Sequence, residues 1–282
     1  MTTTRAFKQV DVFTSVPLLG NPVAVILDAE GLSTETMQAM ANWTNLSETT
    51  FVTPATDPAA DYAVRIFTPK SELPFAGHPT LGTAHAVIEA GLAPFNDGKI
   101  MQQCAVGLVE VSQSGAGLSF RLPRYSFEDA PDVDCLAAAL GDGAIVGEPQ
   151  IVNVGPRWVI AELSSVAVVE ELTPDLASLA EYDRTHLTTG LTAYAHGHDG
   201  SLTVRSFAPA DGVPEDPVCG SGNAAVAAYR LRLGQVSAGS SYAVSQGRQV
   251  GRDGRVHVRI EGDSIYVGGQ CVTVIEGIVR LL

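Results

Sequence analysis

The chain has 282 residues, enough for one large domain or two of ordinary size. Hydrophobic residues make up 45 % and charged residues 17 %, so the chain can bury real cores and extended disorder is not expected. Seventeen Lys and Arg against 31 Asp and Glu give a formal net charge of −14, which argues against binding to nucleic acid or to an acidic membrane. No apolar run reaches the roughly 18 residues that a membrane-spanning helix needs.

The first residues and the cysteines indicate the compartment. Residues 1–11 contain no apolar segment of the kind that a signal peptide requires. The four cysteines lie far apart and without CxxC spacing, which is typical of free thiols in a reducing compartment. We therefore expect a globular enzyme of the cytoplasm. The cysteines are Cys104, Cys135, Cys219 and Cys271.

Residues 20–53 predict a strand, a helix and a second strand. A β-branched run follows the turn Gly20-Asn21-Pro22 and has the composition of a strand. Apolar residues then recur at helical spacing behind a Ser33/Thr34 cap, which predicts a helix over about 34–43.

Residues 64–122 predict a strand, a buried helix and an antiparallel hairpin. The strand 64–67 ends before Pro69, because proline cannot donate a hydrogen bond to a neighbouring strand. The Ala-rich segment 82–91 has the pattern of a buried helix with small side chains. Residues 104–122 alternate apolar and polar side chains, as antiparallel strands do.

The second half of the chain repeats the first. Residues 204–224 match residues 64–84 at a fixed offset of 140, and residues 154–160 more weakly resemble 20–26. An Ala-rich segment at 222–234 and alternating residues at 242–275 then predict a helix and strands. A period of half the chain indicates a duplicated domain. The identical pairs are Val64/Val204, Arg65/Arg205, Phe67/Phe207, Pro69/Pro209, Pro74/Pro214, Gly82/Gly222 and Ala84/Ala224.

These elements predict an α+β fold of two pseudo-symmetric domains, each a mostly antiparallel sheet around a central helix. Asp, Pro and Gly concentrate at 125–150, so we expect domains at 1–125 and 126–282, with the C-terminal strand as a candidate to return to the first domain. Equivalent loops of two such domains face one another, and a cleft between domains is a common ligand site. We therefore expect the active site in that cleft.

Two glycine-rich turns, 75–82 and 215–223, each precede an Ala-rich helical segment. The first N–H groups of a helix lack partners within the helix and attract anions, and glycine allows close approach of a ligand. Two such turns facing one space would bind a carboxylate. Alternatively, the glycines only permit tight packing of helix on sheet. Neither turn matches the nucleotide-binding patterns GxGxxG or GxxxxGK[ST], which disfavours nucleotides.

Four titratable side chains accompany these turns or the first helix. Glu48 lies in a neutral Ser/Thr-rich segment without a nearby Lys or Arg, so if buried it could exchange a proton near neutral pH. His78 and Asp216 lie in the two turns and could relay protons or orient a ligand. Cys219 stands where a helix N-terminus would lower the pKa of its thiol. The alternatives are an exposed glutamate, a structural histidine, a turn aspartate and a packing cysteine.

Cofactor sites find little support in the sequence. His196-Gly197-His198 has no acidic partner at metal-ligand spacing, and the surroundings of the three lysines do not suggest a Schiff base. A Gly-x-Ser-x-Gly nucleophile motif is also missing. We expect neither a metal nor a cofactor.

Four motifs in order resemble the PhzF family of phenazine-biosynthesis-type isomerases, which have the diaminopimelate-epimerase fold. They extend the resemblance over nearly the whole chain, and the fold implied is two barrel-like sheets, each around a central helix. The motifs are Gly20-Asn21-Pro22, Leu46-Ser47-Glu48-Thr49-Thr50-Phe51-Val52, Phe75-Ala76-Gly77-His78-Pro79-Thr80-Leu81-Gly82 and Glu215-Asp216-Pro217-Val218-Cys219-Gly220-Ser221-Gly222.

The resemblance also implies roles for single residues. Glu48 matches the glutamate that moves a proton between carbons of a bound substrate without cofactor or metal. His78 and Asp216 match catalytic residues that position the substrate and assist the transfer. The family also implies a homodimer, and a small carboxylate-bearing substrate whose identity the sequence leaves open. The substrate-binding residues implied are Asn21, Ser47, Gly77, Cys219, Gly220, Ser221 and Gly222.

Two other functions stay open at this point. Related epimerases and racemases use two cysteines, and here Ala76 takes the first place and only Cys219 remains, where many relatives carry threonine. This pattern favours the one-glutamate isomerase but leaves an epimerase or racemase that uses Cys219 with Glu48. The other alternative is a non-catalytic protein of the same fold that binds a small acid.

Overall fold

The computed structural model describes residues 3–141 and 145–281. The chain divides into two compact units, one of Met1–Arg121 with Gly268–Leu282 and one of Leu122–Val267. The boundary between the two units follows Arg121, close to the domain boundary predicted at residue 125. The C-terminal segment from Gly268 belongs to the first unit.

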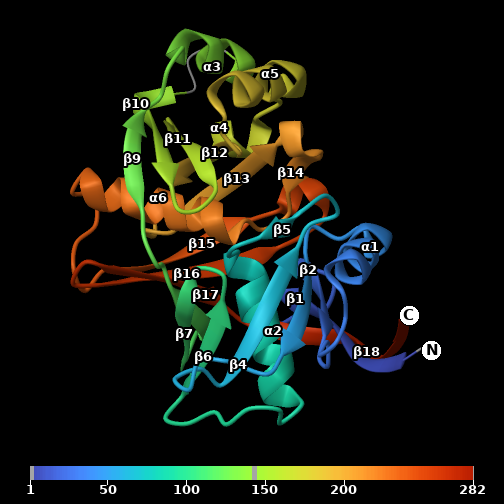
Figure 1. The fold of residues 1–282 in the computed structure, drawn as a ribbon. Helices are drawn as coiled ribbons and strands as arrows, with labels where there is room; N and C mark the ends of the chain where they lie inside the picture. Colours follow the sequence, from blue (N-terminus) through green and yellow to red (C-terminus); the bar gives the residue numbers. More distant parts are fainter. Residues whose placement is uncertain (1–2, 142–144, 282) are drawn as a thin grey trace. The chain divides into compact units, whose positions relative to one another are not determined.

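The first unit is built from strands around one buried helix (Figure 1). Its helices are α1 (Thr34–Thr44) and α2 (Gly77–Glu89). Its strands are β1 (Thr3–Val12), β2 (Asn21–Ile26), β3 (Thr49–Thr53), β4 (Tyr62–Phe67), β5 (Glu72–Leu73), β6 (Lys99–Cys104), β7 (Gly107–Ser114), β8 (Gly117–Arg121) and β18 (Cys271–Leu281).

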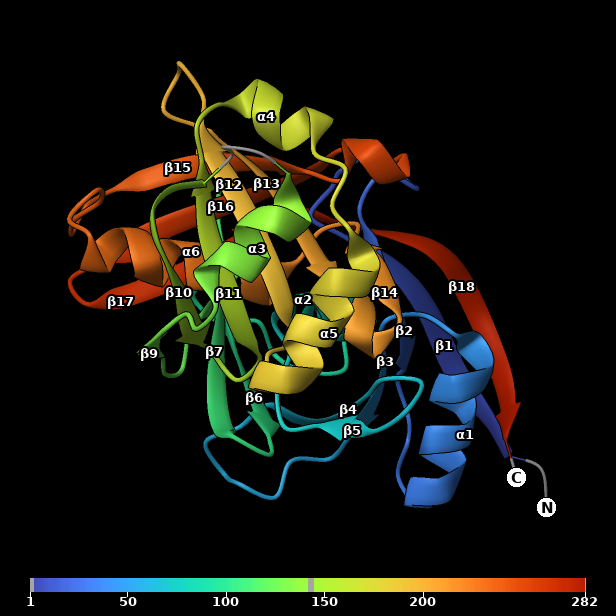
Figure 2. The same cartoon turned by 90° about the horizontal axis from the view of Figure 1, so that it is seen from above.

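Most strand pairs of this unit are antiparallel. β1 lies between β18 and β2 and runs antiparallel to both (Figure 2), and the pairs β3–β4, β6–β7 and β7–β8 are antiparallel as well. The pairs β2–β3 and β4–β6 are parallel. Helix α2 packs against β1, β2, β3, β6, β8 and β18, so it is the central helix of the unit.

The second unit contains the remaining elements. Its helices are α3 (Val133–Leu140), α4 (Val166–Glu171), α5 (Leu176–His186) and α6 (Gly220–Arg232), with short 3-10 turns η1 (Pro209–Asp211) and η2 (Arg248–Val250). Its strands are β9 (Ser126–Asp129), β10 (Ile145–Asn153), β11 (Arg157–Leu163), β12 (Gly190–His196), β13 (Leu202–Ala208), β14 (Val213–Asp216), β15 (Ser241–Gln246), β16 (Gly254–Glu261) and β17 (Ser264–Gly269), the last of which ends in the first unit.

The two units repeat one order of strand pairings, which confirms the predicted duplication. The pairs β10–β11, β11–β12, β12–β13 and β13–β15 are antiparallel, parallel, antiparallel and parallel, as are β1–β2, β2–β3, β3–β4 and β4–β6. Helix α6 is the counterpart of α2 and packs against β10, β11, β12 and β16. The predicted α+β fold with mostly antiparallel sheet is therefore confirmed.

One ion pair is repeated together with the strands. Arg65 on β4 binds both carboxylate oxygens of Glu72 at 2.7 Å, and Arg205 on β13 binds both of Glu215 at 2.9 and 2.7 Å. In each unit the guanidinium also lies over a phenylalanine two residues further on, 5.1 and 5.0 Å from the ring centre. These ion pairs attach β5 to β4 in the first unit and β14 to β13 in the second. Each ion pair therefore fixes the strand that leads into one of the two predicted glycine-rich turns.

The helices begin where their caps allow. Helix α1 matches the predicted segment, and the Ser33 hydroxyl accepts a hydrogen bond from the N–H of Thr36. Helix α2 begins at Gly77 rather than at the predicted residue 82, because Pro79 lies in its first turn, where a backbone N–H has no partner within the helix. Helix α6 similarly begins at Gly220, two residues before the predicted start. Within the described residues, no helix is both long and apolar enough to cross a membrane.

Asp183 gives the second unit a pH-dependent stability. It lies in α5 with only 3 % of its surface exposed, and its Oδ1 accepts a hydrogen bond from Thr188 at 2.7 Å. Its Oδ2 is buried without a hydrogen-bond partner among the described residues. Burial raises the pKa of Asp183 to about 6, although the Thr188 hydrogen bond opposes the shift. The folded state therefore holds this proton more tightly than the unfolded chain does, and stability falls as the pH rises from about 4 to about 6.

We expect Asp183→Asn to remove this loss, because an amide carries no charge to bury. The variant should be more stable than the parent by about 1–3 kcal/mol at pH 7–8, and the gain should vanish near pH 4. Urea denaturation at a series of pH values measures both. Asp263→Asn, at an exposed turn, is the matched control. An equal effect of the two substitutions at every pH would contradict the assignment.

Candidate active site

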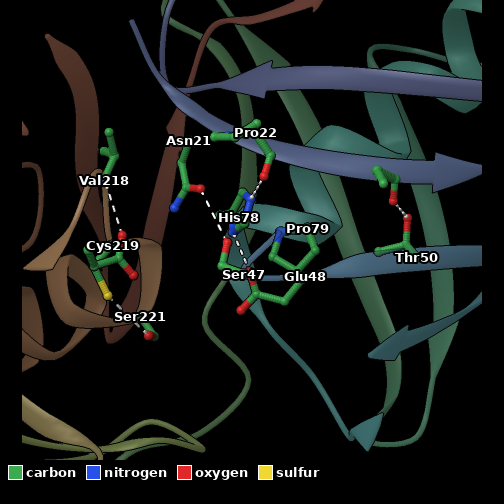
Figure 3. A network of polar contacts seen from close by, with 12 residues as sticks. Asn21, Pro22, Ser47, Glu48, Thr50, His78, Pro79, Val218, Cys219 and Ser221 are labelled. Atoms are coloured by element: carbon green, nitrogen blue, oxygen red, sulfur yellow. Dashed lines mark hydrogen bonds and ion pairs between the residues drawn. The ribbon is translucent and has the colours of Figure 1, made fainter. Parts of the chain in front are cut away.

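A carboxylate and an imidazole from two elements of the first unit lie in contact (Figure 3). Glu48 directly precedes β3, and His78 is the second residue of α2. Glu48 Oε2 lies 3.1 Å from His78 Nδ1, and the side chains are 17 % and 5 % exposed. The pair is thus mostly removed from water.

The other ring nitrogen of His78 faces a backbone carbonyl. His78 Nε2 lies 3.4 Å from the carbonyl oxygen of Pro22, at the start of β2. Both neighbours accept hydrogen bonds, so a ring that donates from both nitrogens suits the carboxylate on one side and the carbonyl on the other.

The pKa of Glu48 results from opposing effects. Burial raises it, but the nearby charge of His78 and hydrogen bonds from His78 and Ser47 outweigh burial, and the net pKa lies below the ordinary glutamate value. The expectation that no charged neighbour holds down the pKa of Glu48 is therefore wrong. It rested on Lys and Arg near in sequence, whereas His78 comes from α2. Glu48 is ionised at neutral pH and can act as a base.

Two further predicted residues lie beside this pair. Asn21 is buried at the start of β2, and the Ser47 hydroxyl donates to Asn21 Oδ1 at 3.4 Å. Figure 3 shows Asn21, Ser47, Glu48 and His78 as one network of polar side chains. Four residues predicted from three separate motifs are thus brought together in the first unit.

Gly77, the first residue of α2, has a packing reason to be glycine. A Cβ placed there would lie 2.4 Å from the ring of Phe120 on β8. Phe120 is fully buried, so the ring cannot move aside. Tight packing therefore suffices to explain the glycine at position 77. The role of Gly77 in substrate binding stays a prediction.

The second unit groups the other predicted residues at the start of α6. Asp216 ends β14, and its Oδ1 accepts from the N–H of Val218 at 3.0 Å, as in an Asx turn. Cys219 is the N-cap of α6, and its Sγ accepts from the N–H of Gly222 at 3.2 Å. Figure 3 also draws the 3.5 Å contact between Cys219 Sγ and the hydroxyl of Ser221. Gly220 opens the helix as its first residue.

Gly222 is also required by packing. A Cβ at this position would lie 2.6 Å from the Thr192 hydroxyl and 2.9 Å from that of Ser206. Ser221 of this turn is itself held by a neighbouring side chain. The indole N–H of Trp158 donates to the Ser221 hydroxyl at 2.9 Å.

Gln246 positions the turn and was missed by the sequence analysis. It is buried at the end of β15, and its Oε1 accepts from the N–H of Cys219 at 3.2 Å and from Asn223 Nδ2 at 2.8 Å. Its Nε2 donates to the carbonyl of Asp216 at 3.2 Å. The available signal was weak: alternation in β15 places Gln246 on the same buried face as Val244, where a polar side chain needs partners.

The groups described above are suited to proton transfer and to anion binding. The first unit holds an ionised carboxylate next to an imidazole, and the second holds hydroxyl, thiol and backbone N–H donors at a helix start. Over residues 3–141 and 145–281, no three His, Cys, Asp or Glu side chains gather as a metal-binding group.

Known proteins resemble the chain over nearly its whole length. Residues 10–277 match the family model PhzC-PhzF, described as phenazine biosynthesis-like protein. The chain is 38 % identical to "Antisense-enhancing sequence 1" of Schizosaccharomyces pombe, covering 98 % of both proteins. It is 37 % identical to the trans-2,3-dihydro-3-hydroxyanthranilate isomerase of Pseudomonas aeruginosa, covering 95 % of this chain and 96 % of that enzyme.

Solved structures of PhzF-family proteins and of an epimerase share the fold of this chain. A phenazine biosynthesis protein of the PhzF family from Bacillus anthracis superposes with a TM-score of 0.84 at 26 % identity, covering 98 % of this chain and 99 % of that one. A hydroxyproline epimerase from Agrobacterium vitis superposes with a TM-score of 0.69 at 15 % identity, over 98 % and 92 % of the two chains, and this likeness concerns the fold alone. The predicted epimerase-like duplicated fold is therefore confirmed.

We expect Gln246→Leu to destabilise the protein by about 2–4 kcal/mol, because the N–H of Cys219 and the amide of Asn223 would lose their acceptor inside the protein. Urea denaturation measures the loss. Gln113→Leu, at an exposed position of β7, is the control for the change of residue type and should be nearly neutral. Equal stability of Gln246→Leu and the parent would show that the amide does not hold the turn.

Proposed function

We propose that this chain, which belongs to the PhzC-PhzF family of phenazine biosynthesis-like proteins, moves a proton between two carbons of a small carboxylate-bearing substrate. The chain is an isomerase, like the relatives that are named isomerases. The observation that carries the proposal is the buried contact between Glu48 and His78, in which the carboxylate is ionised and ready to accept a proton.

In the proposed reaction Glu48 takes a proton from one carbon of the substrate. The electron pair of the broken C–H bond forms a new π bond to the neighbouring carbon, and the π bond already on that carbon shifts its pair to the carbon beyond. The protonated carboxyl then delivers the proton to that second carbon, which regenerates the carboxylate. His78 stabilises the carboxylate before the transfer and orients it through the 3.1 Å contact. Carboxylate and imidazole together supply this chemistry, so the proposed reaction requires no cofactor.

The substrate class comes from the relatives. The Pseudomonas aeruginosa relative is named for isomerisation of trans-2,3-dihydro-3-hydroxyanthranilate, a cyclic amino and hydroxy acid. We propose a substrate of that class. Asp216 and the turn Cys219–Gly222 are proposed to take part in binding it, with the first N–H groups of α6 as donors to a carboxylate.

An epimerase or racemase is the second candidate function. The observation that favours it is the contact of Cys219 Sγ with the N–H of Gly222 at a helix start, since such a donor stabilises a thiolate. Inversion of a stereocentre with uptake of solvent deuterium would select this function over the isomerase.

We also propose that the enzyme is a cytoplasmic homodimer. Cys104, Cys135, Cys219 and Cys271 are all free thiols, which suits a reducing compartment.

We expect Glu48→Gln to lower turnover by about 10³-fold or more while the fold and substrate binding persist, because the amide has the shape of the carboxylate but cannot accept the proton. Formation of the isomerised product, followed by NMR with trans-2,3-dihydro-3-hydroxyanthranilate and a panel of small cyclic amino and hydroxy acids, measures turnover. Calorimetry measures binding.

Glu30→Gln, at an exposed position before α1, is the matched control and should leave the rate unchanged. A rate like that of the parent in Glu48→Gln would refute the proposed base. Tight binding of a small acid by the unaltered protein, with neither an isomerised product nor exchange of carbon-bound protons, would favour the non-catalytic function.

We expect His78→Gln to move the acidic limb of the pH profile of kcat/KM to higher pH. The substitution removes the charge and the hydrogen bond that lower the pKa of Glu48, while the burial that raises it remains. Because the ionised form is the base, activity is lost as the pH falls through this pKa, and the loss should begin at higher pH in the variant. His198→Gln, at an exposed loop, should leave the limb in place. If the acidic limb of the pH profile is the same in His78→Gln as in the parent, His78 does not lower the pKa of Glu48.

A further inference from the structure

Two buried hydroxyls join β3 to α2 close to the proposed base. Thr50 on β3 and Thr83 on α2 are both fully buried, and their hydroxyl oxygens lie 2.8 Å apart. Thr83 Oγ1 also lies 2.7 Å from the carbonyl oxygen of Pro79, and Thr50 Oγ1 lies 3.4 Å from that of Ala24 on β2. Because a hydroxyl can both donate and accept, the two side chains form one hydrogen-bonded chain from β2 through β3 to the first turn of α2.

This chain lies next to the residues that carry the proposed chemistry. Thr50 follows Glu48 by two residues (Figure 3), so the two side chains leave the backbone on the same side, which is the side that contacts α2. Pro79 directly follows His78, and Thr83 stands about one helical turn further on. Any shift of α2 along β3 would therefore change the hydroxyl contact and the carboxylate–imidazole contact together.

Close packing brings α2 within reach of β3. A Cβ on Gly82 would lie 2.3 Å from a methyl group of Val23 on β2 and 3.0 Å from one of Val12 on β1, so glycine lets the helix approach the sheet closely. Thr83 comes directly after Gly82 and makes the polar contact beside this apolar one. Apolar packing is not directional, whereas a hydrogen bond is. The hydroxyl contact is therefore suited to fix the position of the helix along the strand.

The second unit repeats this scaffold without the base, so it shows what packing alone requires. With residues 20–26 aligned on 154–160, the registers of β2–β3 and β11–β12 place Leu191 at the position of Thr50. Leu191 is 1 % exposed and belongs to the apolar core of the second unit. The fold thus accepts an apolar side chain at this position, and packing does not require the hydroxyl of Thr50.

The helix side of the contact is repeated in a different form. Asn223 is the counterpart of Thr83 at the offset of 140, and each side chain bonds to the carbonyl of the residue four positions earlier. The Asn223 amide then reaches Gln246 on β15, whereas Thr83 reaches Thr50 on β3. The helix is thus joined to the strand that follows the base in the unit that has a base, and to a different strand in the unit that lacks one.

We propose that Thr50 and Thr83 are positioning residues for the base, and that their hydrogen bond sets the contact between its carboxylate and the imidazole of His78. Neither threonine is proposed to touch the substrate. The inference rests on the proposed function, in which Glu48 accepts the proton. Loss of the hydroxyl bond would let α2 move relative to β3, and a longer contact with His78 would oppose the effect of burial on the pKa of Glu48 less strongly.

Replacement of each hydroxyl by a methyl group tests this role at nearly constant shape. We expect Thr50→Val and Thr83→Val each to lower kcat about 10- to 100-fold and to change KM less than about twofold, because the base is misplaced while the groups that bind substrate remain. The acidic limb of the pH profile of kcat/KM should move to higher pH, since the pKa of Glu48 rises when His78 lowers it less. The double variant should lose no more activity than the weaker single variant, because both substitutions remove the same interaction.

Serine variants separate the hydroxyl from the packing. Thr50→Ser and Thr83→Ser lose a buried methyl group but keep the hydroxyl, so they should be less stable than the parent and keep its kcat and acidic limb. Thr188→Val is the matched control in the second unit, because it removes a buried hydroxyl bond of 2.7 Å to Asp183, and it should leave kcat and the acidic limb unchanged. Circular dichroism and thermal unfolding verify that each variant is folded in the assay, and Thr50→Val carries the test if Thr83→Val does not fold.

A titration without substrate measures the same effect directly. NMR of protein containing isotope-labelled glutamate follows the side-chain carboxyl carbon of Glu48, whose signal is the one that disappears in Glu48→Gln. The pKa of this carboxyl should be higher in Thr50→Val than in the parent, and equal to that of the parent in Thr50→Ser and Thr188→Val.

Two results would overturn the inference. One is a kcat, an acidic limb and a titration like those of the parent in both valine variants. The other is an equal loss of kcat in the serine and valine variants, which would assign the effect to packing. If instead Glu48→Gln keeps the rate of the parent, the proposed function fails, and the titration still decides whether the two threonines position the carboxylate.

Discussion

Each unit is organised around a helix whose first turn is buried, and a buried helix start must find partners for backbone N–H groups that the helix itself cannot satisfy. At the start of α6, Gln246 Oε1 accepts from the N–H of Cys219, and Cys219 Sγ accepts from the N–H of Gly222. In α2, Pro79 removes one of the donors altogether. At the start of α6 this constraint accounts for polar side chains even before any ligand binds, whereas no side chain caps the start of α2.

The duplication is symmetric in its scaffold and asymmetric in its chemistry. The bidentate geometry of the ion pair Arg65–Glu72 is repeated in Arg205–Glu215, although the second pair is more deeply buried. The base is not repeated: when 20–26 is aligned with 154–160, the parallel registers of β2–β3 and β11–β12 place Thr189 at the position of Glu48. Thr189 accepts a hydrogen bond from the N–H of Arg157 and serves the turn. One carboxylate base in a two-fold scaffold accords with a proton taken and returned by the same group.

The sequence predicted what is local or repeated. The helix over 34–43 and the order of elements follow from short-range periodicity, and the offset of 140 residues indicated the duplication. The partner of Glu48 could not be predicted in this way, because His78 is 30 residues away along the chain and belongs to another element. The role of Gln246 depends likewise on where β15 meets α6, which no local pattern encodes.

The protonation state of Glu48 depends on two opposing effects, burial and the contact with His78. Burial without a partner would raise the pKa of the carboxyl and leave it protonated, ready to donate rather than accept. Full exposure would keep it ionised, but water would hydrate the charge and compete for the proton. His78 allows both requirements to be met: it permits burial and keeps the carboxylate charged through a contact of 3.1 Å. Under the proposed function, an ionised Glu48 therefore makes the first proton transfer run from substrate to enzyme.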